Sequence, residues 1–376
     1  MRIAIVGSGI SGLVAAWLLQ RRHAVTVFEA GDHVGGHSNT VPVPWAGRTW
    51  AVDTGFIVFN RHNYPHFCRI LDHLGVAAQD SEMSFSVHCE QTGLEWNGSD
   101  LRRLFVQKRN AVDPRFWRML RDIVRFNRLA KRAVEDGAGG ETLGAFCDRH
   151  RLGHWFRRYY IVPMASAIWS MPPVAIMDFP LITMARFMLQ HRMLDLRDRP
   201  QWRTVAGGSW TYVRALTHDF RDRIHLRTPV RGVRREADGV LVRTDADETR
   251  FDQVVFACHS DQALAALQDA DAQERAVLGA IRYQPNDAVL HTDTRLMPRR
   301  RRAWAAWNAH VDPRHPEQPA SLTYNMNILQ RLHAPRQFLV TLGRDRDIAE
   351  EHVLRRIRYQ HPLFDTAAIA AQGRHD

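Results

Sequence analysis

The spacing of apolar residues changes twice near the start of the chain, from a strand pattern to a helical one and back. The segment RIAIVG, residues 2–7, is a run of mostly β-branched apolar residues that ends in glycine, as expected for a strand buried in a parallel sheet. In LVAAWLLQRR, residues 13–22, apolar residues recur at helical spacing, and AVTVFEA, residues 24–30, has the pattern of a strand again. Together these segments predict a βαβ unit.

The middle of the chain alternates between helical and extended patterns. YPHFCRILDHLGV, residues 64–76, predicts an amphipathic helix with a glycine cap, and EMSFSVHCEQTGLEWNG, residues 82–98, predicts a hairpin. Residues 101–200 predict mostly helices that are rich in methionine and aromatic residues. Such residues can line a pocket for a long apolar substrate or fill the core of a domain, and the pattern leaves both interpretations open.

Glycines mark two later turns. Gly207 and Gly208 directly precede another helical pattern, while Asp238 and Gly239 form a dipeptide typical of a tight hairpin turn. The apolar segment that follows this hairpin predicts a buried strand over Val254–Cys258.

The chain has 376 residues and a formal net charge of +11, which is compatible with a nucleic-acid or membrane partner. Lysine occurs only at Lys108 and Lys131, so the charge comes from arginines spread along the chain, and we expect no nucleic-acid partner. Arg299–Arg302 form one dense cluster close to Trp304 and Trp307. This segment is a candidate for contact with a membrane surface.

Cysteine usage and the first apolar stretch both indicate a cytoplasmic location. The four cysteines lie far apart and form no CxxC pair, which predicts neither a zinc site nor a disulfide framework; they are Cys68, Cys89, Cys147 and Cys258. Ile3–Leu19 is apolar enough to imitate a signal peptide or a membrane span. Three glycines and two serines interrupt it, however, and no small-residue cleavage site follows.

The turn between the first strand and the first helix has the pattern G-x-G-x-x-G at Gly7, Gly9 and Gly12. The first glycine permits the tight turn, the second lets the backbone approach a pyrophosphate, and the third allows close packing of helix and strand. Ser11 can add a hydroxyl beside the phosphates, which the helix N-terminus attracts. Glu29, at the end of the second strand, can accept hydrogen bonds from a ribose diol and repels a 2′-phosphate, which favours NAD or FAD over NADP.

A second glycine pair follows the acid in GDHVGGHSNT, residues 31–40. The fingerprint and this pair together resemble the flavin-containing amine oxidase superfamily, which includes phytoene desaturases and protoporphyrinogen oxidases. The resemblance implies FAD as the cofactor and places Gly35 and Gly36 beside it. Most members have arginine after the glycine pair, whereas this chain has His37, a weaker phosphate partner.

Further segments extend the resemblance over nearly the whole chain. VDTGFIVFN, residues 52–60, is similar to the segment that passes the flavin ring, which implies that Thr54, Gly55 and Phe56 border the isoalloxazine. Asp53 can also act simply as a turn-forming carboxylate that accepts hydrogen bonds from backbone amides. Val230 corresponds to a valine whose backbone holds the adenine in the superfamily.

The resemblance implies an α/β fold with a discontinuous Rossmann-like FAD-binding domain and an inserted mixed α+β substrate domain. We expect the FAD-binding domain over residues 1–60 and 204–270, and the substrate-binding domain over residues 61–203 and 271–376. The superfamily ends with a glycine-containing strand and helix at the flavin. We expect this chain to lack that segment, since it stops at GRHD, residues 373–376.

The function implied is that of an FAD-dependent oxidoreductase that takes a hydride from an apolar substrate. A narrower resemblance, to bacterial amine-oxidase-like proteins commonly encoded beside lipid-modifying methyltransferases, favours desaturation or isomerisation of a lipid acyl chain. An amine oxidase and a truncated, non-catalytic nucleotide-binding protein are the alternatives. Spacing identifies no catalytic base. The histidine pairs His33/His37 and His62/His66 lack the further ligands that a metal site needs, and we expect no metal.

Overall fold

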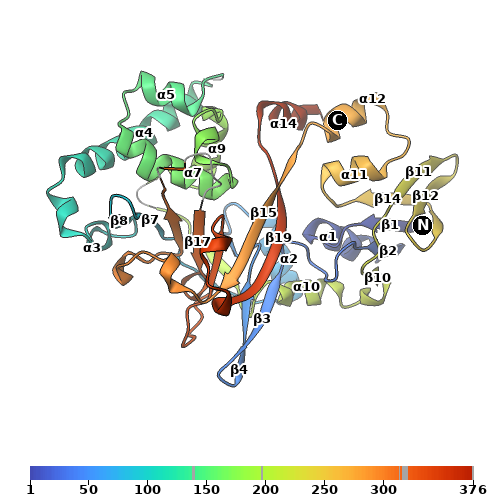
Figure 1. Ribbon diagram of the computed structural model, residues 1–376. Coiled ribbons are helices and arrows are strands. Elements are labelled where there is room, and N and C mark those ends of the chain that lie inside the picture. The colour runs from blue at the N-terminus through green and yellow to red at the C-terminus, as the bar shows by residue number, and fades with distance from the viewer. Residues whose placement is uncertain (138–139, 196–197, 313, 316–320, 375–376) are drawn as a thin grey trace.

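The computed structural model of the protein describes all residues except 138–139, 196–197, 313, 316–320 and 375–376. Two sheets dominate the described part, a parallel sheet of four strands and a mixed sheet of seven. In Figure 1 the long strands β15 (Tyr283–His291) and β19 (Val353–Pro362) run through the middle of the view. They separate a group of helices from the parallel sheet.

The parallel sheet has the strand order β10-β2-β1-β14, with β10 at Ile224–His225, β2 at Ala24–Phe28, β1 at Arg2–Val6 and β14 at Gln253–Phe256. The helix α1 (Ile10–Leu19) connects β1 to β2, which confirms the predicted βαβ unit. Because β10 and β14 come from a distant part of the chain, the Rossmann-like domain is discontinuous, as expected. Ile5, Leu13 and Val27 are fully buried where α1 covers the sheet.

The strand β14 differs from its prediction in length and in burial. It ends at Phe256 rather than at Cys258, and its apolar residues are half-buried instead of buried. The physical reason is position, because β14 is the edge of the described sheet and pairs with β1 alone. The predicted hairpin turn at Asp238 and Gly239 is confirmed, since Glu236 pairs with Gly239 across it. That hairpin belongs to a three-stranded antiparallel sheet of β11 (Gly232–Glu236), β12 (Gly239–Arg243) and β13 (Glu248–Phe251).

The mixed sheet brings together strands from two distant parts of the chain in the order β19-β15-β18-β17-β16-β7-β8. Its first part is the hairpin predicted over residues 82–98, and β7 pairs with β16 in parallel, while the other pairs are antiparallel. The bounds of these strands are β7 Phe85–Cys89, β8 Leu94–Asn97, β16 Trp307–His310, β17 Ser321–Asn325 and β18 Leu339–Leu342.

Two small sheets contain the strands that follow the glycine turns, together with β9 from a later part of the chain. The ribbon of β3 (Thr40–Trp45) and β4 (Arg48–Asp53) projects at the lower edge of Figure 1. The second small sheet has the order β5-β9-β6, with β5 at Val58–Phe59, β9 at Arg203–Val205 and β6 at Ala78–Asp80. The predicted amphipathic helix, α2 (Pro65–Leu74), lies between β5 and β6 in the chain and ends at Gly75 in a left-handed conformation with φ 66°.

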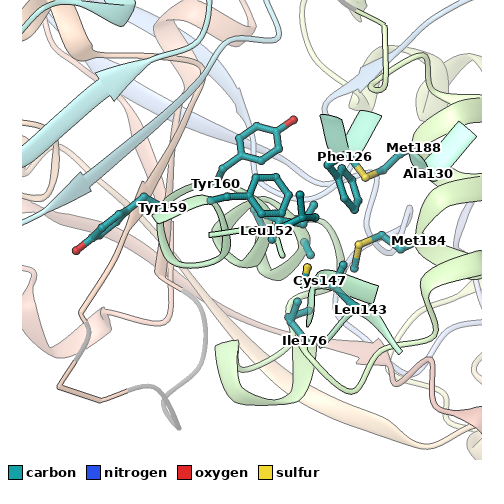
Figure 2. Close-up of a cluster of buried hydrophobic side chains, with 14 of the residues drawn as sticks. Phe126, Ala130, Leu143, Cys147, Leu152, Tyr159, Tyr160, Ile176, Met184 and Met188 are labelled. Atoms are coloured by element: carbon teal, nitrogen blue, oxygen red, sulfur yellow. The ribbon is translucent and has the colours of Figure 1, made fainter. Parts of the chain in front are cut away.

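Residues 101–200 are mostly helical, as predicted, and their largest apolar side chains form a closed core. Figure 2 shows Phe126, Cys147, Tyr160, Met184 and Met188 in this cluster, and each is at most 8% exposed. The sequence left a substrate pocket and a domain core as alternatives for these residues, and the buried cluster favours the core. The main helices are α3 Leu101–Leu104, α4 Pro114–Glu135, α5 Leu143–Arg149, α6 His154–Phe156, α7 Val162–Trp169, α8 Pro173–Ile176 and α9 Leu181–Gln190.

The remaining helices are short and lie around the two sheets. Their bounds are α10 Trp210–Thr217, α11 Ser260–Ala266, α12 Ala272–Leu278, α13 Met326–Leu329 and α14 Thr366–Ala371. Within the part of the chain that the structure describes, no helix has the length and apolar character needed to cross a membrane. The four cysteines are free.

The arginine cluster proposed for membrane contact is partly engaged inside the molecule. Arg300 donates to the buried carboxylate of Glu95 at 3.0 Å, and the backbone N–H of Arg299 donates to the same carboxylate at 2.7 Å. Trp307 packs edge-on against Tyr324, with ring centroids 5.1 Å apart. These contacts give the cluster a structural role, although all four of its arginines are exposed. Membrane contact therefore remains a prediction.

Candidate functional site

Backbone contacts shape the first glycine turn and leave no room for a side chain at Gly7 or Gly12. Gly7 has φ 104°, and its N–H donates to the carbonyl of Phe28 at 2.8 Å. A Cβ on Gly12 would lie 2.0 Å from the Gly7 carbonyl oxygen. A Cβ on Gly9, in contrast, would meet no atom within 4 Å. Gly9 precedes α1, and no side chain caps the helix there, so open space lies beside its first N–H groups.

Glu29 ties this turn to the end of β2. Its Oε2 accepts hydrogen bonds from the N–H of Ser8 at 2.9 Å and from the Ser8 hydroxyl at 2.5 Å, while Oε1 accepts from the N–H of Gly31 at 2.7 Å. Ser8 is fully buried, whereas Ser11 is exposed at the first turn of α1. The sequence singled out Ser11 and missed Ser8. The signal that could have revealed Ser8 is its place between the first two glycines, opposite the acid that ends β2.

Replacing Ser8 with alanine tests this link. The change removes one hydrogen bond to a charged acceptor but leaves the backbone N–H of Ser8 on Glu29. We expect a loss of about 1.5–3 kcal/mol in the free energy of unfolding, because bonds to charged groups have that typical strength. Denaturant unfolding measures it, with Ser11→Ala at the exposed position as the control. Equal stability of the two variants would show that the Ser8 hydroxyl does not hold the turn.

The second glycine pair lies directly against the first turn. The N–H of Gly35 donates to the carbonyl of Ser8 at 2.9 Å, and Gly9 and Gly35 form a parallel β-bridge. Gly36 has φ 57°, and a Cβ on it would lie 3.2 Å from the Gly9 Cα. The two glycine segments, separated by a helix and a strand in the sequence, thus form one cradle of backbone atoms.

His37 is neutral in the fold. Its ring stacks on Tyr359 at a centroid distance of 4.6 Å and lies near His361. Burial, with the charges of His361 and His259 as secondary causes, lowers the pKa of His37 to about 4. At neutral pH its ring therefore carries no charge to offset a pyrophosphate. Its buried Nε2 has no hydrogen-bond partner among the described residues, so it can still bond to a ligand.

The segment after β4 packs against the backbone of His37. The N–H of Phe56 donates to the His37 carbonyl at 2.7 Å, and a Cβ on Gly55 would lie 2.3 Å from that same oxygen. The hydroxyl of Thr54 lies 3.0 Å from the Tyr359 hydroxyl and donates to the Asn39 carbonyl at 3.1 Å. The backbone of His37 therefore requires glycine at position 55, whether or not a flavin ring also lies against it.

Asp53 accepts a hydrogen bond from a backbone amide, as predicted, but that amide belongs to the distant Ser209 rather than to a local turn. Asp53 is fully buried at the end of β4 and accepts hydrogen bonds from the Thr40 hydroxyl at 2.5 Å and the Ser209 N–H at 2.9 Å on Oδ1. Gln330 donates to Oδ2 at 3.0 Å. Burial raises the pKa of Asp53 to about 6, although the Thr40 and Ser209 bonds partly oppose that shift.

Val230 lies in the coil after β10, half-buried beside the cluster of the three-stranded sheet. Its contact with an adenine stays a prediction, as do the ligand contacts of the other cofactor residues. The structure does bring the two glycine segments, Glu29, His37 and residues 54–56 together around one cradle.

A cavity of about 1320 Å³ lies between helices α6–α8 and strands β15 and β16. Its wall includes Asn286, whose amide nitrogen lies 2.9 Å from His361 Nδ1 and 3.1 Å from the Ser170 hydroxyl. His361 neighbours His37, so the cavity wall is linked to the cradle by consecutive contacts. The lining of the cavity combines apolar residues of α7 and α8 with arginines and acids.

The parallel sheet and the two glycine turns define a dinucleotide-binding protein of the Rossmann type. The sequence profile of the family described as "flavin containing amine oxidoreductase" matches residues 10–317, and the chain belongs to this family. FAD is accordingly its cofactor. A curated relative from Mycobacterium tuberculosis, described as a putative flavin-containing monoamine oxidase, is 26% identical over 272 residues. The match covers 68% of this chain and 56% of the relative, so the chain spans about half the length of that protein.

Solved structures of the same fold include enzymes with different substrates. Cyclohexylamine oxidase from Brevibacterium oxydans aligns with a TM-score of 0.66 at 15% identity, over 96% of this chain and 84% of that enzyme. A fatty acid isomerase from P. acnes that produces CLA aligns with a TM-score of 0.62 at 16% identity, over 99% of this chain and 89% of that enzyme. At these identities the likeness establishes the fold alone, and it confirms the expected fold class.

The residues of the cradle fit FAD. Gly9 has open space where a pyrophosphate needs it, while Gly12 has none, which is the difference that the fingerprint requires. Gly7, Gly9, Gly12, Gly35 and Gly36 would accommodate the phosphates, Glu29 the adenosine ribose, and the unpaired Nε2 of His37 would offer one hydrogen bond.

Proposed function

We propose that the protein is an FAD-dependent oxidoreductase that takes a hydride from carbon in a lipid acyl chain, in a desaturation or an isomerisation. The cavity beside the cradle carries this proposal, because its apolar wall from α7 and α8 can bind a hydrocarbon chain. Val162, Pro163, Val174 and Met177 contribute to that wall. FAD, when bound, supplies the acceptor for the hydride.

The residues at the cavity can position the substrate beside the cofactor, and we assign none of them as a catalytic base. Asn286 presents its side chain at the cavity wall, where Ser170 and His361 hold its amide. Thr54 and Tyr359 join the segment after β4 to the long strand β19 through the contact of their hydroxyls. These contacts fix the boundary between the cradle and the cavity. The boundaries given above for a cofactor domain and a substrate domain are part of the same proposal.

An amine oxidase is the second candidate, favoured by the Mycobacterium tuberculosis relative. Such an enzyme commonly surrounds the substrate nitrogen with aromatic rings. Among the described residues, the cavity is lined by no phenylalanine, tyrosine or tryptophan. Its charged lining contains both arginines and acids, so charge alone selects neither an amine nor a fatty acid. The missing aromatic cage favours the acyl substrate.

Anaerobic reduction of the FAD-loaded chain tests the proposal. Purified protein is mixed with FAD, and its absorbance is followed on addition of free fatty acids, phospholipids or primary amines. We expect acyl lipids to bleach the flavin or to be converted to positional isomers detectable by gas chromatography. Bleaching by amines alone would establish the alternative. A flavin that dithionite reduces but no lipid or amine does would contradict both candidates and indicate a non-catalytic nucleotide-binding protein.

A further inference from the structure

The mixed sheet places two histidines side by side at the cavity. β7 and β16 pair in parallel, and their register sets His310 opposite His88. The ring centroids are 4.9 Å apart, with an angle of 54° between the planes, so the rings do not stack. Glu90 follows two residues after His88, and its Oε1 lies 3.5 Å from His310 Nε2. One potential ligand atom from each of the three residues lies within 4.8 Å of the other two.

Each of the two rings has one nitrogen without a hydrogen-bond partner among the described residues. Nδ1 of His88 and Nε2 of His310 are both buried, and neither forms a hydrogen bond with the described residues. His88 as a whole is only 5% exposed. Buried polar atoms in folded proteins almost always have a partner, so two unpaired nitrogens on adjacent rings indicate a ligand shared between them.

We propose that His88, His310 and Glu90 bind a divalent transition-metal ion of the zinc class. Two imidazole nitrogens and one carboxylate oxygen form a donor set that suits Zn²⁺, Co²⁺ and Ni²⁺ better than Mg²⁺ or Ca²⁺, which prefer oxygen alone. Glu90 and His310 both line the cavity. Three protein ligands leave a coordination position for water or for a group in that cavity.

The protonation of the imidazoles agrees with this donor set. Burial is the main cause that lowers the pKa of both His88 and His310, with help from the charge of Arg344. Both rings are neutral at pH 7 and can offer a lone pair without first losing a proton. The proposal itself depends on the register of β7 and β16 and on the unpaired nitrogens.

Arg344 is a positively charged neighbour of this cluster and would favour an anion over a metal ion as the ligand. Its Nη1 lies 3.6 Å from Glu90 Oε1, is buried, and has no hydrogen-bond partner among the described residues. Its Nε is held by Asp347 at 2.6 Å. An anion would satisfy the guanidinium but would have to approach the carboxylate of Glu90. A cation has three donors and one opposing charge. Both Arg344 and His310 face Oε1 of Glu90, and the carboxylate can turn its second oxygen toward Arg344 while Oε1 binds the ion. We therefore favour a cation, bound less tightly than in a closed structural zinc site.

Glu90 attracts a cation and Arg344 repels it, so substitutions of these two residues should change zinc binding in opposite directions. Zinc chloride is titrated calorimetrically into the purified chain in a buffer that contains no phosphate or chelator, and Co²⁺ is followed by its visible absorption. We expect one ion per chain. Glu90→Gln, at a half-exposed position, should weaken binding by at least about tenfold, as should His310→Gln. Arg344→Gln should tighten binding, because it removes the opposing charge. His154→Ala, at another histidine of the same cavity, is the matched control and should bind like the parent chain.

Three results would overturn the proposal: no saturable binding of Zn²⁺ or Co²⁺, equal binding by Glu90→Gln and the parent chain, or weaker zinc binding by Arg344→Gln. Parallel titration with inorganic phosphate would reveal an anion site instead, if Arg344→Gln abolished it. Circular dichroism of each variant checks that it is folded. Because the readout involves no flavin and no turnover, failure of the proposed oxidoreductase function would leave this test unaffected.

Discussion

Gly12→Ala is expected to abolish FAD binding and to destabilise the fold strongly. The added Cβ would lie 2.0 Å from the carbonyl oxygen of Gly7 and 3.2 Å from the Cβ of Ala257. Neither neighbour can move easily, because the N–H of Gly7 is bonded to Phe28 on β2 and that of Ala257 to Val6 on β1. We expect a loss of about 3 kcal/mol or more in the free energy of unfolding, as for severe overpacking in a core. Denaturant unfolding measures this loss.

Gly9→Ala is the matched variant that separates binding from stability. Gly9 has φ −64° and ψ 175°, which alanine adopts without strain, and its Cβ would meet no atom within 4 Å. Stability should therefore change by less than about 0.5 kcal/mol. Flavin fluorescence titration should nevertheless show at least about tenfold weaker FAD binding, because the methyl group would occupy the approach to the first N–H groups of α1. Normal FAD affinity in Gly9→Ala would show that the pyrophosphate does not pass this glycine.

The features of the site that could be predicted from the sequence are local ones, and the glycine turn is the clearest example. The βαβ unit is local, because each strand and the helix follow from the spacing of their own apolar residues. The roles of Gly9 and Gly12 follow from the same short segment. The hairpin of β7 and β8 and the helix α2 were predictable for the same reason.

Features that depend on strand register could not be predicted in this way. His88 and His310 belong to strands that are far apart in the sequence, and only the pairing of β7 with β16 sets them side by side. No spacing rule connects them, which is why the sequence showed no candidate metal site. Glu95 and Arg300 are a second example, because the arginine looked like part of a surface patch until its buried partner was seen.

The apolar residues of 101–200 were ambiguous for a different reason. Methionine and aromatic side chains have the same pattern whether they surround a ligand or one another. The structure shows that most of them pack together, as do Met184, Met188 and Phe126, while the cavity takes its wall from a few residues of α7 and α8 and from charged loops. Composition alone cannot make this distinction.

Asp53→Ala is expected to have the largest effect on stability outside the glycine turns. The change removes an acceptor from three buried donors, on Thr40, Ser209 and Gln330. Gln330 keeps a longer bond to the Ala51 carbonyl at 3.4 Å, and each donor left unsatisfied costs about 1–3 kcal/mol. Removal of the buried charge offsets part of this cost. We expect a net loss of about 3 kcal/mol at neutral pH, measured by denaturant unfolding. A neutral effect would show that water replaces the carboxylate at this position.

The pH dependence of stability provides an independent check on Asp53, with Asp53→Asn as the variant for comparison. The folded pKa of about 6 lies above the ordinary value of 3.8, because burial disfavours the charged form. In the folded state Asp53 therefore takes up its proton as the pH falls through about 6, while the unfolded chain keeps its carboxylate ionised until about 4. Stability contributed by this group accordingly rises as the pH falls between those values, and is lost again as the pH rises through 6.

Asparagine cannot titrate, so subtracting the pH profile of Asp53→Asn from that of the parent chain isolates this contribution. We expect the parent chain to gain about 3 kcal/mol relative to the variant between pH 7 and pH 4, since two pKa units correspond to that energy. The variant also sets its amide nitrogen or oxygen against Gln330, whose Oε1 is already held by the N–H of Asp53 at 2.9 Å. That cost is independent of pH and shifts the difference without changing its slope. A flat difference would show that Asp53 keeps an ordinary pKa in the fold, and that its three donors compensate fully for its burial.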